Sequence, residues 1–298
     1  MIRAADFYRF MRAQLTALPN VDVRLARVES IADGEDWAEV LINEVPFRAK
    51  WVFDSRYRPS EYRPLTQRYR YLTQHFLGWE IETVKPIFTP AVPRLFDFRA
   101  PQRNVMACFY VLPLTERRGL VEYTLFSDHL LPLETYQEAL RGYIETVLKA
   151  HSYRILEEEK DLIPMTDHPF PRRAGQRILN IGTRGGRVKP SSGYAFHRIQ
   201  QDAKAIVRPL EARGHPFDLP EPPRRYRMFD AMLLQILHRQ GHLGKAIFLR
   251  LFQRNPIQRI FRFLDKEDNL WENLKVMASV PPLPFARAWL HIVLLGRA

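Results

Sequence analysis

The spacing of apolar residues along the chain separates expected helices from expected strands. Apolar residues recur every third or fourth position in residues 4–18 and 133–150, which predicts amphipathic helices there. Alternating or short continuous apolar runs predict strands at residues 21–28, 38–42, 47–56, 80–88, 94–99, 105–113, 119–127 and 153–159. Prolines punctuate the stretch from 80 to 127 and indicate strand edges and turns, so we expect a largely antiparallel sheet.

The pattern of residues 178–200 predicts a short apolar strand, a glycine-rich turn and a helix, and this stretch is the most informative of the chain. Gly182, Gly185 and Gly186 permit a tight turn with close backbone approach. Ser191 or Ser192 is a plausible N-cap for the following helix. The free backbone N–H groups at such a helix start suit an anionic or electron-rich ligand. No GxGxxG or Walker pattern occurs, so spacing alone favours an ordinary strand–turn–helix.

Composition narrows the class of protein without choosing a partner. The 298 residues can form one large domain or two smaller ones, and no segment is apolar enough to span a bilayer. The first residues lack the apolar region of a signal peptide. The single cysteine, Cys108, excludes an internal disulfide framework and fits a reducing compartment. A net charge of +12 points to nucleic acid, an anionic membrane surface or phosphates.

The segment GLVEYTLFS, residues 119–127, carries the most informative acidic residue. Strand alternation places Glu122 on the same face as Leu120, Thr124 and Phe126. If that face is buried, desolvation raises the pKa of Glu122 and keeps a proton available near neutral pH. The alternative is that the face is solvated or that Glu122 pairs with an arginine, and the residues alone favour this alternative.

The C-terminal part, residues 213–298, begins with a proline-rich linker and continues as basic helices. Its apolar stripe consists of Phe229, Met232, Leu233, Ile236, Leu237, Leu243, Ile247 and Leu251. Such helices can lie on an anionic membrane, or they can pack as a helical cap with a solvated polar face. His238 and His242 stand four residues apart without an evident third ligand, so we expect a solvent-facing pair and no metal site.

Several phrases resemble those of the lycopene cyclases, which are flavoproteins related in fold to the aromatic hydroxylases, and they occur in the family's order. The matching phrases are Asp54-Ser55-Arg56, the residues from Gln74 to Trp79, FYVLPL at 109–114, LVEYTLF at 120–126, IPMTDHPFP at 163–171 and KPSSGYAFHRIQQDA at 189–203. The resemblance implies a mixed α/β (α+β) fold with an antiparallel substrate-binding sheet and a C-terminal helical region. The chain would be an incomplete flavoprotein of the aromatic-hydroxylase-like type.

The resemblance also implies a division into four parts. Residues 1–58 would be the remnant of a flavin-binding domain, and residues 59–174 the substrate-binding sheet domain. Residues 175–212 would be the flavin-contacting strand, loop and helix that return to the first domain. Residues 213–298 would form the basic amphipathic helical region.

The activity implied by the resemblance is cyclisation of the ends of linear lycopene to ionone-type rings, an isomerisation in carotenoid biosynthesis. Glu122 would be the acid–base residue. Reduced FAD, with NAD(P)H as reductant, would stabilise the cationic transition state by its negative charge. The implied cofactor contacts are Asp54, Arg56, Gly182, Gly185, Gly186, Lys189, Pro190, Ser191, Ser192, Gly193 and Tyr194. The implied substrate contacts are Gln74, His75, Phe76, Trp79, Phe109, Tyr110 and Met165.

The sequence departs from this family at one important motif. Family members begin with a strand–GxGxxG–helix unit and a later acidic residue that hold the dinucleotide, and this chain has neither. A truncated or split cyclase, with a separate chain supplying the dinucleotide-binding half, is therefore expected, at the cytoplasmic face of the cell membrane. The alternatives are loss of flavin binding and a catalytically incomplete remnant that binds carotenoid or membrane. Nucleic-acid binding ranks last because the arginines are dispersed.

Overall fold

The computed structural model describes residues 2–62, 69–102, 104–221, 223–267 and 269–294. The chain forms two compact units: the first comprises Met1–Asp54 with Arg173–Leu179, and the second comprises Ser55–Arg172 with Asn180–Ala298. The predicted return segment, 175–212, is thus divided, because only its residues through Leu179 belong to the first unit. The functional labels of the four predicted parts stay predictions.

The first unit contains one helix and short strands. Its elements are α1 (Ala4–Thr16), β1 (Val28–Ala32), β2 (Ala38–Ile42), β3 (Val45–Ala49) and β4 (Val52–Asp54), and β4 pairs with β10 (Ile178–Asn180). β1, β2 and β3 form an antiparallel meander whose tight turn has positive φ at Asn43 and Glu44. The Asp33 carboxylate accepts hydrogen bonds from the backbone N–H groups of Gln176 and Arg177 at 2.7 and 2.9 Å, which fastens the returning strand.

Two strand predictions in this unit are wrong. The alternating segment 21–28 is not a strand, because β1 begins only at Val28 and pairs through Ala32 with β2. Alternation indicates a strand only where a partner offers hydrogen bonds, and the residues before Val28 have no strand partner among the described residues. The predicted strand 47–56 is divided into β3 and β4 by a break at residues 50 and 51.

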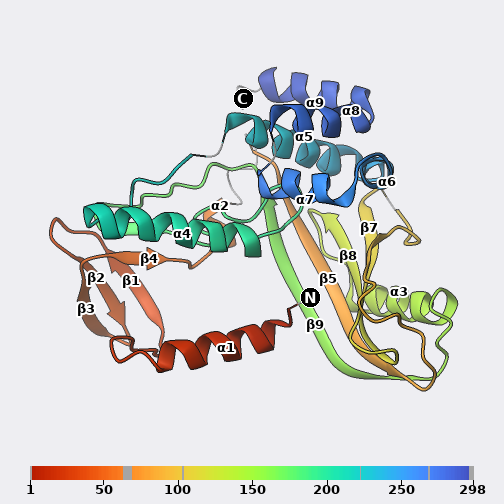
Figure 1. Ribbon diagram of the computed structural model, residues 1–298, viewed down its shortest axis with the longest axis horizontal. Helices are drawn as coiled ribbons and strands as arrows, with labels where there is room; N and C mark the ends of the chain where they lie inside the picture. The colour runs from red at the N-terminus through yellow and green to blue at the C-terminus, as the bar shows by residue number, and fades with distance from the viewer. Residues whose placement is uncertain (1, 63–68, 103, 222, 268, 295–298) are drawn as a thin grey trace. The chain divides into compact units, whose positions relative to one another are not determined.

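The second unit contains a five-stranded antiparallel sheet in the order β6-β7-β8-β5-β9. Its strands are β5 (Tyr71–Thr83), β6 (Arg94–Asp97), β7 (Met106–Pro113), β8 (Arg118–Ser127) and β9 (Tyr153–Thr166). Figure 1 shows β9, β5, β8 and β7 side by side. The antiparallel prediction is confirmed. β5 begins earlier and β9 ends later than predicted, because polar residues interrupt the apolar pattern at both ends of this pair.

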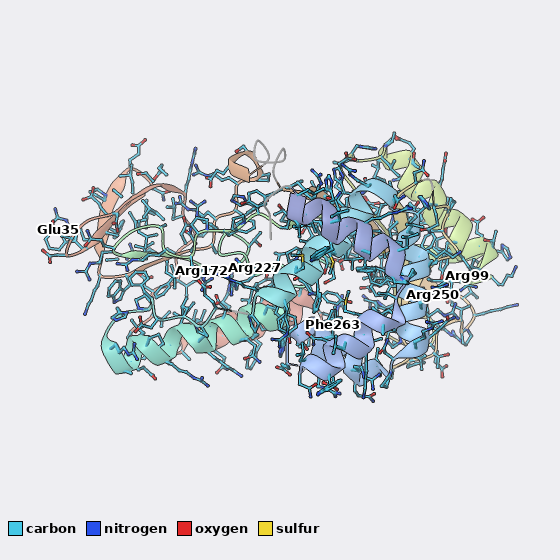
Figure 2. All side chains as sticks on the ribbon, turned by 90° about the horizontal axis from the view of Figure 1, so that it is seen from above. Glu35, Arg99, Arg172, Arg227, Arg250 and Phe263 are labelled. Atoms are coloured by element: carbon cyan, nitrogen blue, oxygen red, sulfur yellow. The ribbon has the colours of Figure 1, made fainter. Side chains whose placement is uncertain are left out.

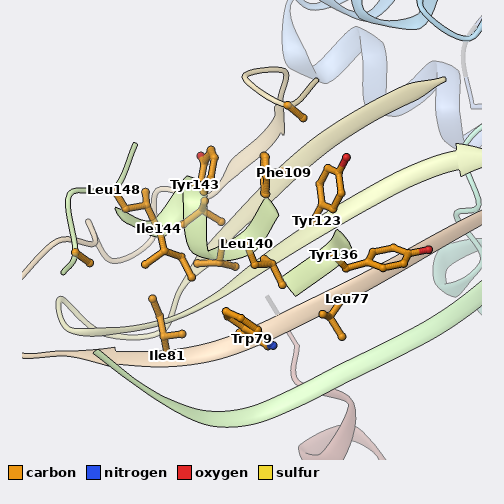
Figure 3. Close-up of a cluster of buried hydrophobic side chains, with 14 of the residues drawn as sticks. Leu77, Trp79, Ile81, Phe109, Tyr123, Tyr136, Leu140, Tyr143, Ile144 and Leu148 are labelled. Atoms are coloured by element: carbon orange, nitrogen blue, oxygen red, sulfur yellow. The ribbon is translucent and has the colours of Figure 1, made fainter. Parts of the chain in front are cut away.

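Helices cover both faces of this sheet, and each face has its own apolar cluster. α3 (Leu133–Thr146) covers the first face, where Leu77, Trp79, Phe109, Tyr123, Leu140 and Ile144 are among the packed residues (Figure 3). On the second face, Leu72, Met106, Cys108, Phe126 and Met165 pack against residues of α5 (Arg224–Gln240) and α6 (Leu243–Arg254). Alternate residues of one strand therefore belong to different cores.

The remaining described helices are α2 (Pro59–Tyr62), α4 (Phe196–Arg213), α7 (Ile257–Asp265), α8 (Leu270–Ser279) and α9 (Pro282–Leu294). A third apolar cluster joins α5 and α6 to α8 and α9, with Met232, Ile247, Phe285 and Ile292 among its buried residues. The helical prediction for the C-terminal part is confirmed. Among the described residues, no helix is long and apolar enough to cross a membrane.

A buried hydrogen-bond chain holds α3 on the first face. The Ser127 hydroxyl donates to the His129 carbonyl at 2.5 Å, and a carbonyl can only accept. His75 Nε2, at 2.8 Å from the Ser127 hydroxyl, must therefore donate to it. His75 Nδ1 is left to accept from the Tyr136 hydroxyl at 2.6 Å. His75 is thus fixed as one neutral tautomer that links β5, β8 and α3, and burial lowers its pKa to about 4.

We expect this chain of hydrogen bonds to make stability depend on pH. An unfolded histidine titrates near 6.5, so between this value and about 4 the unfolded state binds more protons, and stability falls as the pH is lowered through that window. Tyr136→Phe leaves His75 Nδ1 without its donor and costs about 1–3 kcal/mol of unfolding free energy. Urea titrations at pH 7.5 and 5 measure both effects.

Tyr153→Phe is the matched control, because the Tyr153 hydroxyl has no hydrogen-bond partner among the described residues while the ring lies partly buried against the same core. Equal unfolding free energies for the Tyr136 and Tyr153 variants would contradict the assigned chain.

Candidate functional site

Glu122 lies in the middle of β8, on the sheet face opposite α3. The antiparallel register places it directly across from Gly78 on β5 and from Tyr110 on β7. Its neighbours along the strand on this face are Leu120 and Thr124, as alternation predicts. Glu122 therefore lies near the middle of its own strand, and that strand lies between β5 and β7, away from the sheet edges.

The surroundings of Glu122 favour its protonated form. Burial raises the pKa of Glu122 to about 7, opposed by a hydrogen bond that the Thr124 hydroxyl donates to Oε1 and assisted by the nearby charge of Glu159. Among the described residues no lysine or arginine forms a salt bridge with Glu122, whereas Glu80 pairs with Arg118. The described contacts thus contradict the alternative in which Glu122 is one member of a surface ion pair.

The expected substrate residues divide between the two faces of the sheet. Gln74, Phe76 and Tyr110 lie on the Glu122 face, because their strand positions are in register with those of β8 on that face. Met165 shares this face but is fully buried against α5 and α6 residues. The Glu122 face therefore carries Gln74, Phe76 and Tyr110 beside the fully buried Met165.

Three expected substrate residues point to the opposite face. His75 belongs to the hydrogen-bond chain with Tyr136, and Trp79 Nε1 donates to the Glu158 carboxylate at 3.0 Å. Phe109 stacks on Tyr143 of α3 with ring centroids 4.0 Å apart (Figure 3). Each fills the α3 core, so the structure does not bring these three residues to Glu122, and we leave them out of the proposed site.

The glycine-rich loop before α4 contacts the Glu122 face. Gly182, Gly186 and Gly193 have positive φ values of 57°, 69° and 73°, a conformation that favours glycine. A Cβ added to Gly193 would lie 2.3 Å from Gln74 Oε1, so the loop backbone sits directly on β5. Gly185 is needed for a different reason, since its added Cβ would lie 2.5 Å from the Asn180 carbonyl oxygen.

The N-cap prediction is wrong, and the structure shows why. α4 begins at Phe196 after Ala195, which provides no side-chain cap. Ser191 instead donates its hydroxyl to Asp230 Oδ1 at 2.6 Å, and the Lys189 ammonium donates to the same oxygen. Burial opposes ionisation of Asp230, but the charges of Lys189 and Lys266 and the hydrogen bonds from Lys189 and Ser191 together outweigh it and lower the pKa of Asp230. The side chains of Lys189 and Ser191 thus bind Asp230 of α5, and we do not assign them to a ligand.

The remaining loop residues offer unfulfilled hydrogen-bonding groups. α4 has no side-chain cap and no acidic residue in its first turn, so no described carboxylate of that turn offsets its positive dipole end. Ser192 Oγ and Gln74 Oε1 are buried without a hydrogen-bond partner in the described part of the chain. Pro190 is half-buried and Tyr194 is 43% exposed beside them. These groups fit the polar edge of a planar heterocycle such as a flavin ring.

The two other expected cofactor residues follow β4. Asp54 ends β4 in the first unit and is 5% exposed. Arg56 is the second residue of the second unit, where its carbonyl accepts a hydrogen bond from Arg184 Nη1 at 3.1 Å. Arg184 Nε also donates to Asn180 Oδ1 at 3.1 Å, so one guanidinium ties Arg56 to the start of the glycine-rich loop.

Two residues of this site were missed by the sequence reasoning. Gly78 and Glu159 are abreast of Glu122 on the same face, since Gly78 pairs with both glutamates. Alternation along each strand predicts which of its residues share a face. It does not predict which strands pair or where β5 begins. For metals, the described residues contain no group of three or more suitable side chains, and His238 and His242 are both exposed.

The solved structures that resemble this chain share its fold. A flavin-dependent brominase superposes with a TM-score of 0.51 at 12% identity, covering 97% of this chain and 75% of the brominase. A geranylgeranyl bacteriochlorophyll reductase-like protein of Thermoplasma acidophilum gives a TM-score of 0.48 at 13% identity, covering 97% of this chain and 74% of its own. The chain thus shares the fold of the brominase, and the mixed α/β prediction is confirmed.

Sequence comparison gives a narrower assignment. A lycopene beta-cyclase of Paracoccus sp. (strain N81106 / MBIC 01143) is 26% identical over 245 residues, which cover 74% of this chain and 60% of the relative. The match thus spans about 60% of the length of this curated relative. The family model described as "Lycopene cyclase protein" matches residues 1–290. With nearly every residue inside that match, the chain belongs to the lycopene cyclase family.

Proposed function

We propose that this protein cyclises the ends of linear lycopene, with Glu122 as the acid–base residue. The observation that carries the proposal is a half-buried carboxyl group without a basic partner among the described residues, on the sheet face that the glycine-rich loop contacts. A carboxyl group whose pKa is raised to about 7 by burial still holds its proton near neutral pH. Such a group can act as a general acid in water-poor surroundings.

The reaction is balanced without an external oxidant or reductant. Glu122 transfers its proton to the terminal double bond of the polyene, and a carbocation forms. The neighbouring double bond donates its electron pair to this cation, which closes the six-membered ring and moves the positive charge into it. A base then removes a ring proton, so one proton enters and one leaves. Phe76 and Tyr110, on the same face, can present ring faces to the cation.

The proposal includes reduced FAD as cofactor and NAD(P)H as its reductant. Gln74, Ser192, Gly193 and the first N–H groups of α4 would hold the flavin ring, since their hydrogen-bonding groups fit its polar edge. When bound, reduced flavin supplies negative charge opposite the carbocation. The sequence has no dinucleotide-binding motif, so a further segment or a separate chain would hold the nucleotide part.

A peripheral position on the cytoplasmic face of an anionic membrane, where a polyene would dissolve, is also part of the proposal. The apolar stripe predicted on α5 and α6 is used for packing, which favours the helical-cap interpretation of that pair. Figure 2 shows two exposed basic side chains of these helices, Arg227 and Arg250. Within the C-terminal helices, the most exposed apolar side chains lie on α8 and α9 and include Leu270, Trp271, Leu283, Trp289, Leu290 and Leu294.

The second candidate is a catalytically incomplete member that binds carotenoid or membrane. The sequence feature that favours it is the missing dinucleotide-binding motif. It shares the membrane surface and the apolar sheet face with the first candidate, but it requires no proton on Glu122. Substitution of Glu122 therefore separates the two functions.

Glu122→Gln should abolish cyclisation, because the amide keeps the shape of the side chain but cannot donate the proton. The loss should be at least about 100-fold. The measurement is pigment analysis of a lycopene-accumulating host that expresses the chain alone or together with a dinucleotide-binding polypeptide. Glu116→Gln is the control, since Glu116 is exposed in the turn before β8. Full activity of the Glu122 variant would refute the acid–base role, and unchanged lycopene with the folded wild-type chain would favour the second candidate.

Replacing Trp271 and Trp289 by alanine should weaken membrane binding. Their side chains are 74% and 49% exposed, and burial of apolar area in a bilayer is worth roughly 25 cal/mol per Å². We expect a drop of about tenfold in binding to phosphatidylglycerol vesicles, measured by flotation. Trp37→Ala, at a residue that is 46% exposed in the first unit, serves as control. If the Trp37 variant loses as much vesicle binding as the variant without Trp271 and Trp289, α8 and α9 are not the docking surface.

A further inference from the structure

Two glutamates face each other across a glycine in the middle of the sheet. Gly78 on β5 pairs with Glu122 on β8 and, on its other side, with Glu159 on β9. Directly paired residues of antiparallel strands project to the same face. Glu122, Gly78 and Glu159 therefore form one row across three strands, on the face where we propose that the polyene reacts.

The missing side chain of Gly78 leaves the space between the two glutamates to Glu159. A Cβ added to Gly78 would lie 3.0 Å from Glu159 Cγ and 3.2 Å from Glu159 Oε1. The Glu159 side chain thus extends over β5 in the direction of β8. Neighbouring strands are about 4.8 Å apart, so the two glutamate backbones are roughly 10 Å apart, a gap that the extended side chains largely close.

Neither glutamate is neutralised. Within the described part of the chain, no salt bridge to a lysine or arginine involves Glu122 or Glu159, although the sequence contains 45 such cations. Further along β5, Glu80 pairs with Arg118, and Glu82 pairs with Arg154. Arg118 and Arg154 are therefore placed beside other carboxylates and not beside this pair.

The groups around the pair set the order in which the two glutamates ionise. Burial raises the pKa of Glu159, and so do the charges of Glu157, Glu80 and Asp161. Glu122 has the neutral side chains of Tyr110 and Thr124 as neighbours and the charge of Glu159 across Gly78. The charge of Glu159 raises the pKa of Glu122, whereas Glu122 is not among the groups that raise the pKa of Glu159. The coupling therefore has Glu159 ionised while Glu122 is still protonated, and this charge adds to burial in opposing ionisation of Glu122.

We propose that Glu159, held over Gly78, is a positioning residue whose negative charge keeps the proton on Glu122 until the polyene accepts it. The inference rests on the proposed function for its role in the reaction, whereas the pairing of the two carboxyl groups can be tested without it. After proton transfer, Glu122 becomes a carboxylate opposite Glu159. The repulsion between the two charges favours return of a ring proton to Glu122, which completes a proton-neutral cycle.

The first test is a pH titration of the full chain labelled with [δ-¹³C]glutamate, followed by NMR without lycopene or flavin. The signal that Glu122→Gln removes is assigned to Glu122. In the unsubstituted chain its midpoint should lie near 7. Glu159→Gln should lower this midpoint by about one pH unit, because it removes the opposing charge. A midpoint that does not move would overturn the proposal.

Glu157→Gln is the matched control, since Glu157 lies two residues before Glu159 on the same strand and pairs with Glu80. It removes the same charge from β9 but does not lie over Gly78. We expect it to move the Glu122 midpoint by no more than a few tenths of a pH unit. Equal shifts for the two β9 variants would show a general field of the acidic strand and would also overturn the specific role of Glu159.

A second variant tests the geometry without removing a charge. Gly78→Ala places a methyl group 3.0 Å from Glu159 Cγ and 3.2 Å from both Glu159 Oε1 and Leu120 Cδ1. These contacts are closer than ordinary van der Waals contacts, so the Glu159 side chain is pushed away from its place over Gly78. The Glu122 midpoint should shift in the same downward direction, with circular dichroism confirming that the sheet is intact. An upward shift or none in a folded Gly78 variant contradicts the proposed arrangement.

The activity measurement separates this inference from the proposed function. In a system that forms cyclic carotenes, Glu159→Gln should move the falling limb of the pH–rate profile to lower pH, and Glu159→Asp should restore it partly. If the falling limb of the pH–rate profile does not move in the Glu159→Gln variant, the positioning role is overturned. If Glu122→Gln remains fully active, the proposed function fails, while the titration still decides whether the two carboxyl groups are coupled.

Discussion

The alternation of side chains across the five-stranded sheet is the constraint on which the rest of this structure depends. Because each strand contributes residues to two cores, a shift of one residue in register would exchange the α3 core with the Glu122 face. His75 and Gln74 illustrate this division, since one is tied to Tyr136 and the other lies under the glycine-rich loop. Along each strand, residues that face the candidate site thus alternate with residues that pack in the α3 core.

The sequence allowed much of the fold and part of the site to be predicted. The antiparallel sheet, α3, the strand–loop–helix and the face of Glu122 followed from periodicity, because periodicity reflects burial directly. The neighbours of Glu122 did not follow, since Gly78 and Glu159 are brought to it by pairings of distant strands. The family resemblance identified residues of the β5 phrase but not their faces, and so combined Phe76 with His75 and Trp79.

Errors at the glycine-rich loop had the same origin. Ser191 has the residue type of an N-cap, and Lys189 has the charge of an anion ligand, but both bond to Asp230, about forty residues later on α5. A local pattern cannot reveal a partner of this kind. The segment 21–28 failed for the converse reason, since its alternation was correct for a strand but no pairing strand is present among the described residues.

The bonds from Asp230 to Lys189 and Ser191 have a consequence for chimeric proteins. The shape of the glycine-rich loop is set by a carboxylate that belongs to a C-terminal helix, and all three side chains are buried. A recombination point placed between the loop and α5 would separate a buried carboxylate from the ammonium and hydroxyl that satisfy it. The glycine-rich loop and α5 therefore have to be exchanged together if a chimera is to keep this buried ion pair.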